Sequence, residues 1–181
     1  MELPDKKYNI ILADPAWTYR KSGGIKSSRG LAKKFYNTMT TNEIKNMDIE
    51  SISNDNCYCF MWTTSPKLPE SIEVMKSWKF EYFNVVFTWI KTNKISNSLF
   101  WGMGNTTRAN AEYVLLGRKG KLDRIDKGVH SVIISNIEKH SKKPDEVRDR
   151  IVRLFGDLPR IELFAREKVD GWDSWGLEVS D

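Results

Sequence analysis

The sequence has few residues of the kinds that hold metal ions or form disulfides. Its 181 residues include two cysteines and two histidines, and Cys57, Cys59, His130 and His140 do not have the spacing of a zinc site. Cys57 and Cys59 alternate within an apolar run, so in a strand they point to the same face, where a disulfide between them would be badly strained. We therefore expect buried, reduced thiols and no metal.

The chain also lacks a long hydrophobic run. No apolar segment approaches the roughly 20 residues of a membrane-spanning helix, and Met1–Lys7 is charged, unlike a secretory signal. Internal repeats and low-complexity tracts are absent too. With 40% hydrophobic residues, the composition predicts a single domain over residues 1–181, cytoplasmic and without membrane contact.

The glycine signature of dinucleotide-binding enzymes, G-x-G-x-x-G, is missing. Gly102 and Gly104 have no third glycine and open no helical pattern, which argues against a nicotinamide enzyme. The net charge of +5 favours approach to a polyanion, although many ordinary proteins are this basic. Seven Trp, six Tyr and eight Phe supply rings that can stack on unpaired bases, although most of them will belong to the core.

Apolar runs and helical patterns alternate along the chain. The runs that predict strands are Tyr8–Ala13, Cys57–Thr63, Tyr82–Lys91, Ala111–Gly117, Ser131–Ile134 and Arg160–Ala165. Helices are predicted from Thr40 or Thr41 to Met47, around Leu68–Trp78, and from Pro144, in the first turn, to about Phe155. The alternation predicts an α/β fold with a doubly wound sheet.

A carboxylate follows directly after the first predicted strand. Asp14, the proline-fixed backbone at Pro15 and the indole of Trp17 stand at the end of a buried strand, where open α/β sheets hold ligands. An Asp-Pro pair alone is most often an ordinary turn, but the long polar loop Thr18–Lys34 that follows favours a site. A second charge, Glu112, begins a predicted strand and needs a partner.

These residue types suit methyl transfer to the amino group of adenine. That nitrogen is a poor nucleophile because its lone pair is delocalised into the ring. The Asp14 carboxylate and the Pro15 carbonyl can accept the two amino protons and direct the lone pair at a sulfonium methyl, while Trp17 stacks on the flipped base. Asp14 is then a hydrogen-bond acceptor first.

Blocks of sequence spread over nearly the whole chain carry a family resemblance. They are Asp14–Tyr19, Phe35–Met39, Trp89–Asn93, Trp101–Gly104 with Arg108 and Glu112, His140–Pro144, Glu162–Arg166 and Gly171–Gly176. In this order they resemble the adenine N(6) methyltransferase family typified by the catalytic subunit of the eukaryotic messenger-RNA methyltransferase (the MT-A family), in its compact phage and bacterial branch. The resemblance implies a Rossmann-like, S-adenosylmethionine-dependent methyltransferase sheet with permuted motif order, Asp14 preceding the cofactor strand at Glu162.

The resemblance also implies which residues form the site. The cofactor-binding residues would be Ala13, Asp14, Lys143, Glu162, Phe164, Arg166, Gly176 and Glu178. The catalytic residues would be Asp14, Pro15, Ala16 and Trp17, and the substrate-binding residues Trp17, Tyr19, Tyr36, Arg108 and Glu112. Lys143 would meet the methionine carboxylate, and Glu162 the ribose hydroxyls. Either residue seen alone would be taken for a surface salt bridge.

Several features leave alternatives open. Ala16 replaces the family's more usual second proline, and Leu177 replaces an amide, so it can pack on the cofactor's adenine but not pair with its edge. Trp172 and Trp175 either face the cofactor or belong to the core. The basic stretch Arg118–Lys127 either contacts phosphates or is a solvated loop.

The sequence thus predicts S-adenosylmethionine-dependent methylation of adenine in DNA. One alternative is adenosine methylation in RNA, which uses the same pocket, and another is a non-catalytic nucleic-acid-binding subunit that keeps the fold. DNA is favoured because the short chain carries no appended RNA-binding module, which is an argument by analogy. A chain this short implies a short recognition site, a homodimer that supplies further contacts, or low specificity.

Overall fold

A mixed seven-stranded sheet forms the centre of the molecule, with the strand order β5-β3-β4-β2-β1-β6-β7. The computed structural model describes residues 2–18, 38–104, 106–139 and 141–179. Its strands are β1 (Tyr8–Ala13), β2 (Ser53–Thr63), β3 (Glu81–Thr92), β4 (Glu112–Lys119), β5 (Val132–Asn136), β6 (Arg160–Leu163) and β7 (Asp173–Trp175). Its helices are α1 (Thr41–Lys45), the 3₁₀ turn η2 (Ser65–Lys67), α2 (Leu68–Ser77) and α3 (Glu146–Phe155).

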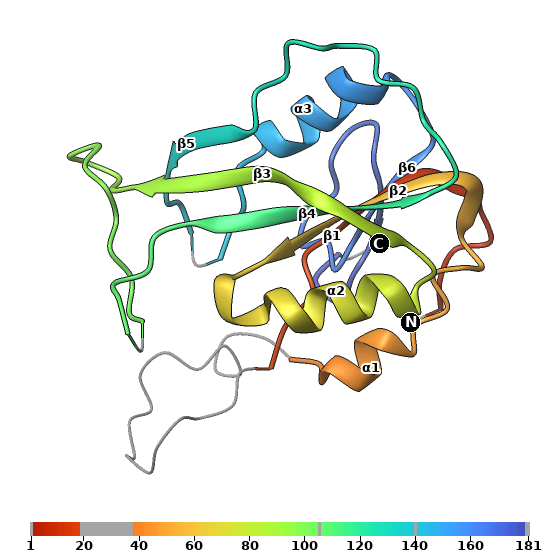
Figure 1. Ribbon diagram of the computed structural model, residues 1–181, viewed down its shortest axis with the longest axis horizontal. Helices are drawn as coiled ribbons and strands as arrows, with labels where there is room; N and C mark the ends of the chain where they lie inside the picture. The colour runs from red at the N-terminus through yellow and green to blue at the C-terminus, as the bar shows by residue number, and fades with distance from the viewer. Residues whose placement is uncertain (1, 19–37, 105, 140, 180–181) are drawn as a thin grey trace.

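Helices cover both faces of this sheet, so the expected α/β class is confirmed. In Figure 1, α3 lies on one side of the strands and α1 with α2 on the other. Most pairings are parallel, but β4 runs antiparallel to both of its neighbours, β2 and β3. The carboxyl ends of β1, β2, β3 and β6 therefore share one edge of the sheet with the amino end of β4.

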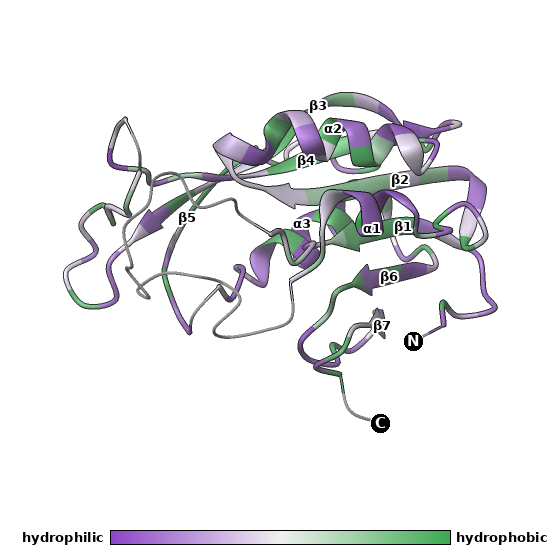
Figure 2. Cartoon of the chain, turned by 90° about the horizontal axis from the view of Figure 1, so that it is seen from below, coloured by the Kyte–Doolittle hydropathy of each residue, from purple (hydrophilic) through white to green (hydrophobic). Residues whose placement is uncertain are grey.

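The apolar runs of the central strands are explained by burial on both faces. Ile11 and Met61 pack toward α1 and α2, whereas Leu12 and Phe60 pack toward Ile151 of α3. In Figure 2, β1 and β2 are largely green, while α1 and α2 are banded purple and green, as expected for helices with one face on a core.

The two cysteines are free and buried, as expected from the alternation of apolar residues. Cys57 and Cys59 both belong to the core on the α1 and α2 side. Burial raises the pKa of the Cys57 thiol to about 12 and that of Cys59 well above its usual value. Both thiols therefore stay protonated and unreactive at neutral pH.

The short helix α1 depends on a capping box. The Thr40 hydroxyl accepts from the backbone N–H of Glu43, and the Glu43 carboxylate accepts from the Thr40 N–H at 2.6 Å. We expect Thr40→Ala to lower the free energy of unfolding by about 1 kcal/mol, because one orphan N–H loses its acceptor. Urea denaturation measures this, with Thr41→Ala as the matched control, and an equal effect of both changes would contradict the capping role.

The entry into α3 differs slightly from the prediction. Asp145 is the N-cap, so Pro144 precedes the helix instead of forming its first turn, and Lys143 lies in the loop before it. This loop reaches the sheet edge where β1 ends, since the Lys143 ammonium contacts Asp14. In the described part of the chain, none of the helices has the length and apolarity to cross a membrane.

Candidate active site

Asp14 stands at the carboxyl end of β1, where Pro15 and Ala16 turn the chain away from the sheet. Its backbone N–H donates to the carbonyl of Leu163 at the end of β6. The Pro15 carbonyl accepts from the Trp17 N–H at 2.8 Å, which leaves one of its two lone pairs for another donor. The buried strand therefore holds Asp14 in place at the edge predicted from the sequence.

Two adjoining cavities open at this edge. The larger, of about 420 Å³, is lined by Asp14, Lys139, Ser141, Lys142, Lys143, Arg148, Glu162, Phe164, Arg166, Glu167 and Glu178. The smaller, of about 170 Å³, is lined by Asp14, Pro15, Ala16, Trp17, Trp62, Thr63, Thr64, Glu112, Ser141, Lys143 and Arg166. Asp14, Ser141, Lys143 and Arg166 line both, so they form a shared wall.

The two sets of residues implied by the resemblance separate between these cavities. The larger contains Asp14, Lys143, Glu162, Phe164, Arg166 and Glu178 of the implied cofactor residues. The smaller contains all the implied catalytic residues together with Glu112. Ala13, whose side chain is wholly buried in the core, and Gly176 line neither. Tyr19 and Tyr36 lie outside the described residues.

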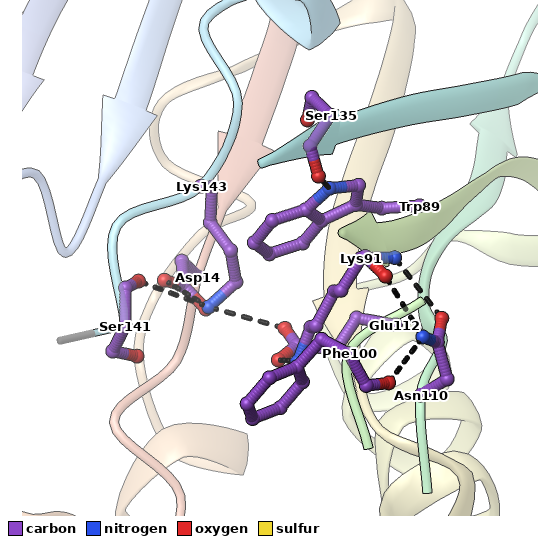
Figure 3. A network of polar contacts seen from close by, with 9 residues as sticks. All are labelled: Asp14, Trp89, Lys91, Phe100, Asn110, Glu112, Ser135, Ser141 and Lys143. Carbon is purple, nitrogen blue, oxygen red and sulfur yellow. Dashed lines mark hydrogen bonds and ion pairs between the residues drawn. The ribbon is translucent and has the colours of Figure 1, made fainter. Parts of the chain in front are cut away.

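An alternating row of charges runs through the shared wall (Figure 3). The Lys143 ammonium lies 3.0 Å from Asp14 Oδ2 and 3.3 Å from Glu112 Oε2, and the Lys91 ammonium lies 2.5 Å from Glu112 Oε1. These four side chains are only 16–19% exposed. The row Asp14, Lys143, Glu112, Lys91, called the charge row below, is electrically neutral, as a buried cluster must be to avoid a large desolvation cost.

The charge row stabilises the ionised forms of its two central members, Lys143 and Glu112. Burial alone would lower the pKa of Lys143, but Asp14 and Glu112 outweigh it and raise that pKa above its usual value. Burial likewise acts to raise the pKa of Glu112, but Lys143 and Lys91 hold it below its usual value. Lys143 is thus a cation and Glu112 an anion at neutral pH.

A second ion pair fixes Glu162 on the wall of the larger cavity. Arg148 of α3 donates through Nε to Glu162 Oε2 at 2.7 Å and through Nη2 to Oε1 at 3.4 Å. Burial raises the pKa of Glu162, and Arg148 opposes that rise. A carboxylate has about four lone-pair positions, so Glu162 keeps capacity for two further donors.

Two tryptophans, Trp17 and Trp62, are among the residues that line the smaller cavity. Trp17 is 5% exposed and belongs to the core, with the Lys67 ammonium 6.0 Å from its ring. Its indole N–H has no hydrogen-bond partner among the described residues. Trp62 packs edge-on against Trp89 at 6.2 Å and lies 5.6 Å from the Lys143 ammonium. Stacking of Trp17 on a base remains a prediction, since most of its ring is in the core.

Gly176 closes the turn behind the larger cavity by close packing. A Cβ at this position would lie 2.3 Å from the carbonyl oxygen of Ala165, so only glycine fits. The preceding Trp175 packs edge-on against Phe164, which has a positive φ of 63° and lines the cavity. Trp172 belongs to the core on the α3 side. Of the two alternatives for Trp172, the core is the correct one.

Arg108 is exposed and lines neither cavity, so its contact with the target nucleotide stays a prediction. Its guanidinium donates to the carbonyls of Gly102 and Trp101, at 2.9 and 3.0 Å, and so stabilises the conformation of its own loop.

Sequence reasoning missed Lys91 and Arg148. Lys91 belongs to one of the sequence blocks that carry the resemblance, and the need of Glu112 for a cationic partner was a signal that could have identified it. Arg148 gave no such signal, because in the sequence it looks like any charged residue on a helix surface.

Because the two cavities share a wall, molecules bound in them would lie side by side, as the transfer of a group from one to the other requires. Group transfer is the class of reaction that a transferase catalyses. The comparisons with known proteins agree. The chain matches the MT-A70 family model over residues 8–178, and it belongs to this family of methyltransferases. The expectation of this family is therefore confirmed.

Individual relatives differ in similarity. The chain is 37% identical to the type II methyltransferase M.MunI of a Mycoplasma species over 196 aligned residues, covering 99% of this chain and 81% of that protein. It is 27% identical to the human N(6)-adenosine-methyltransferase catalytic subunit METTL3, covering 88% of this chain and 26% of that protein. An MT-A70-like N(6)-adenosine-methyltransferase of Arabidopsis thaliana is 24% identical, covering 96% of this chain and 24% of that protein. The chain thus spans about a quarter of these eukaryotic relatives.

Proposed function

We propose that this protein transfers a methyl group from S-adenosylmethionine to the exocyclic amino group of adenine in DNA. The observation that carries the proposal is the shared wall, in which Asp14 and Lys143 border both cavities. The larger cavity would take the cofactor and the smaller the flipped base. We propose further that the order of Asp14 and Glu162 makes this a permuted Rossmann-like methyltransferase, with residues 1–181 as one domain.

The side chains of the larger cavity fit this cofactor. Lys143 is a buried cation that suits the methionine carboxylate, and Glu162 offers acceptors to the ribose hydroxyls. Phe164 provides a ring for the adenine, and Arg166 and Glu178 add charges around it. When bound, S-adenosylmethionine supplies a methyl group on a positively charged sulfur.

On the acceptor side, Asp14 and Pro15 would prepare the amino nitrogen. The carboxylate and the free lone pair of the Pro15 carbonyl accept its two protons, which localises the nitrogen lone pair and points it across the shared wall. The nitrogen–carbon bond forms as the sulfur–carbon bond breaks. The surplus proton then passes from the positively charged amino nitrogen to the adjacent Asp14 carboxylate or to water, without a covalent enzyme intermediate.

DNA is proposed over RNA because of the pattern of similarity. The relative with the higher identity and coverage is the bacterial type II methyltransferase, whereas those named for adenosine, a ribonucleoside, are more distant. A non-catalytic subunit is disfavoured because Asp14, Pro15, Trp17 and Lys143 all border the smaller cavity, and a decayed site would have lost some of them.

The test is incorporation of label from tritiated S-adenosylmethionine. The purified protein is incubated with unmethylated genomic DNA or with total RNA, and the product is digested to nucleosides. We expect label in N(6)-methyldeoxyadenosine from DNA, and labelling at least about 100-fold slower with Asp14→Asn. Label from RNA alone would replace DNA by RNA as the substrate, and cofactor binding without any label would support the non-catalytic alternative.

Arg148 provides a pH-dependent test of the cofactor site. Because Arg148 opposes the rise in the pKa of Glu162, Arg148→Met should raise that pKa further. Glu162 then ionises only at higher pH, and the affinity for S-adenosylmethionine, which needs the carboxylate, should recover only there. Calorimetry over a range of pH measures both proteins, and identical pH profiles would contradict the role given to Glu162.

A further inference from the structure

We infer that Lys91 is a positioning residue for the proposed methyl transfer, because by neutralising Glu112 it leaves the charge of Lys143 available to Asp14 and to the carboxylate of the cofactor. The inference rests on the proposed function. Lys91 lines neither cavity, so it acts through Glu112 and Lys143.

The argument begins with the competition for Lys143. Its ammonium has Asp14 on one side and Glu112 on the other, at 3.0 and 3.3 Å, and also donates to the Ser141 carbonyl at 3.4 Å. The cofactor carboxylate would be a third anion around this one cation. If Glu112 had no other partner, its full negative charge would draw Lys143 away from the shared wall.

Lys91 removes that competition. It holds Glu112 Oε1 at 2.5 Å, the shorter of the two contacts that this carboxylate makes with lysines. With one carboxylate and one ammonium paired at the far end of the charge row, Lys143 can serve the two anions that face the reaction. Both oxygens of Glu112 are engaged by lysines, which fixes the carboxylate beside Lys143, while its remaining lone pairs stay open to a target nucleotide.

The fold holds Lys91 firmly enough for this role. Its backbone N–H donates to Asn110 Oδ1 at 3.0 Å, and its carbonyl accepts from Asn110 Nδ2 and from the Phe100 N–H, both at 2.9 Å. Its ammonium lies 5.0 Å from the ring of Trp89, whose indole N–H donates to the Ser135 carbonyl. Figure 3 shows these contacts converging at the end of the charge row.

The decisive experiment compares the original protein with the single variant Lys91→Met and with the double variant that combines Lys91→Met and Glu112→Gln. The single change leaves Glu112 competing for Lys143, and the dissociation constant for S-adenosylmethionine should rise about tenfold, as when residues that orient metal ligands are lost. The double change removes one positive and one negative charge together, so the affinity for S-adenosylmethionine should return to within about threefold of that of the original protein. Lys94→Met is the matched surface control and should leave this affinity unchanged.

The readouts separate a positioning role from simple structural damage. Binding is measured by calorimetry, turnover with labelled cofactor, and folding by thermal unfolding. Loss of the packing of the Lys91 side chain would persist in the double variant, so failure of that variant to recover would overturn the inference, as would a Lys91→Met protein that behaves like Lys94→Met. An original protein that neither binds the cofactor nor methylates DNA would instead refute the proposed function.

Discussion

Replacing Asp14 by asparagine is expected to lower kcat for adenine methylation by about 10²–10³-fold, the loss found when a preorganised group at the reacting atom is removed. Asparagine keeps the shape and one acceptor oxygen, but it loses the negative charge that localises the nitrogen lone pair and stabilises the positive charge that develops there. The measurement is single-turnover labelling of DNA with tritiated S-adenosylmethionine.

A loss of kcat in Asp14→Asn can be assigned to the carboxylate only if the variant keeps its fold and much of its affinity for the cofactor. Asp14 is held by the backbone of β1 and the Leu163 carbonyl, so the change to asparagine should leave the strand intact. Asp123→Asn, in an 89% exposed side chain, is the matched control. An Asp14→Asn protein that keeps a tenth or more of the original kcat would rule out the role proposed for the carboxylate.

Lys143→Met should have the largest combined effect on stability and binding. The change leaves Asp14 without this ammonium and Glu112 with Lys91 alone, and breaking a buried ion pair by removing one partner lowers the free energy of unfolding by about 3 kcal/mol. Binding of S-adenosylmethionine should be lost at the same time, because the carboxylate of the cofactor would meet the Asp14 and Glu112 carboxylates without the ammonium that lies between them. Urea denaturation and calorimetry measure the two effects.

The effect of Lys143→Met on stability should depend on pH. The pKa of Glu112 is held below its usual value by Lys143 and Lys91, so its ion pairs stabilise the folded protein above the unfolded pKa and are lost as pH falls through the folded one. The stability difference between the original protein and Lys143→Met should therefore shrink in acid. A difference that stays constant through that range would show that packing, not charge, explains the loss.

Much of the fold follows from local patterns in the sequence. Tyr8–Ala13 is a strand with the bounds predicted, because a short apolar run before Asp-Pro has few other structures open to it. The strand β3 and the helix α3 extend close to the predicted residues for similar reasons. Pro144 was placed too far into α3 because a proline is compatible with both the first turn and the residue before the N-cap.

In the candidate site, too, some residues could be predicted from the local sequence and others could not. Asp14, Pro15 and Trp17 are neighbours in the chain, so their shared position at the end of β1 could be read directly. Lys91 could not be identified from its own surroundings, because its partner Glu112 is brought beside it only by the antiparallel pairing of β3 with β4, where Trp89 is opposite Glu112. Arg148 was missed because nothing local shows that its face of α3 meets Glu162 on β6.

The sequence by itself determined most of the strands and helices, the carboxylate at the end of β1, the absence of a dinucleotide signature and the family. Only the tertiary structure decided that β4 runs against its neighbours, that two cavities share one wall, and that Asp14, Lys143, Glu112 and Lys91 form a single charge row. The reason is physical. Periodicity reports which face of an element is buried, whereas contacts between residues far apart in the chain depend on strand order and direction, which local periodicity does not contain.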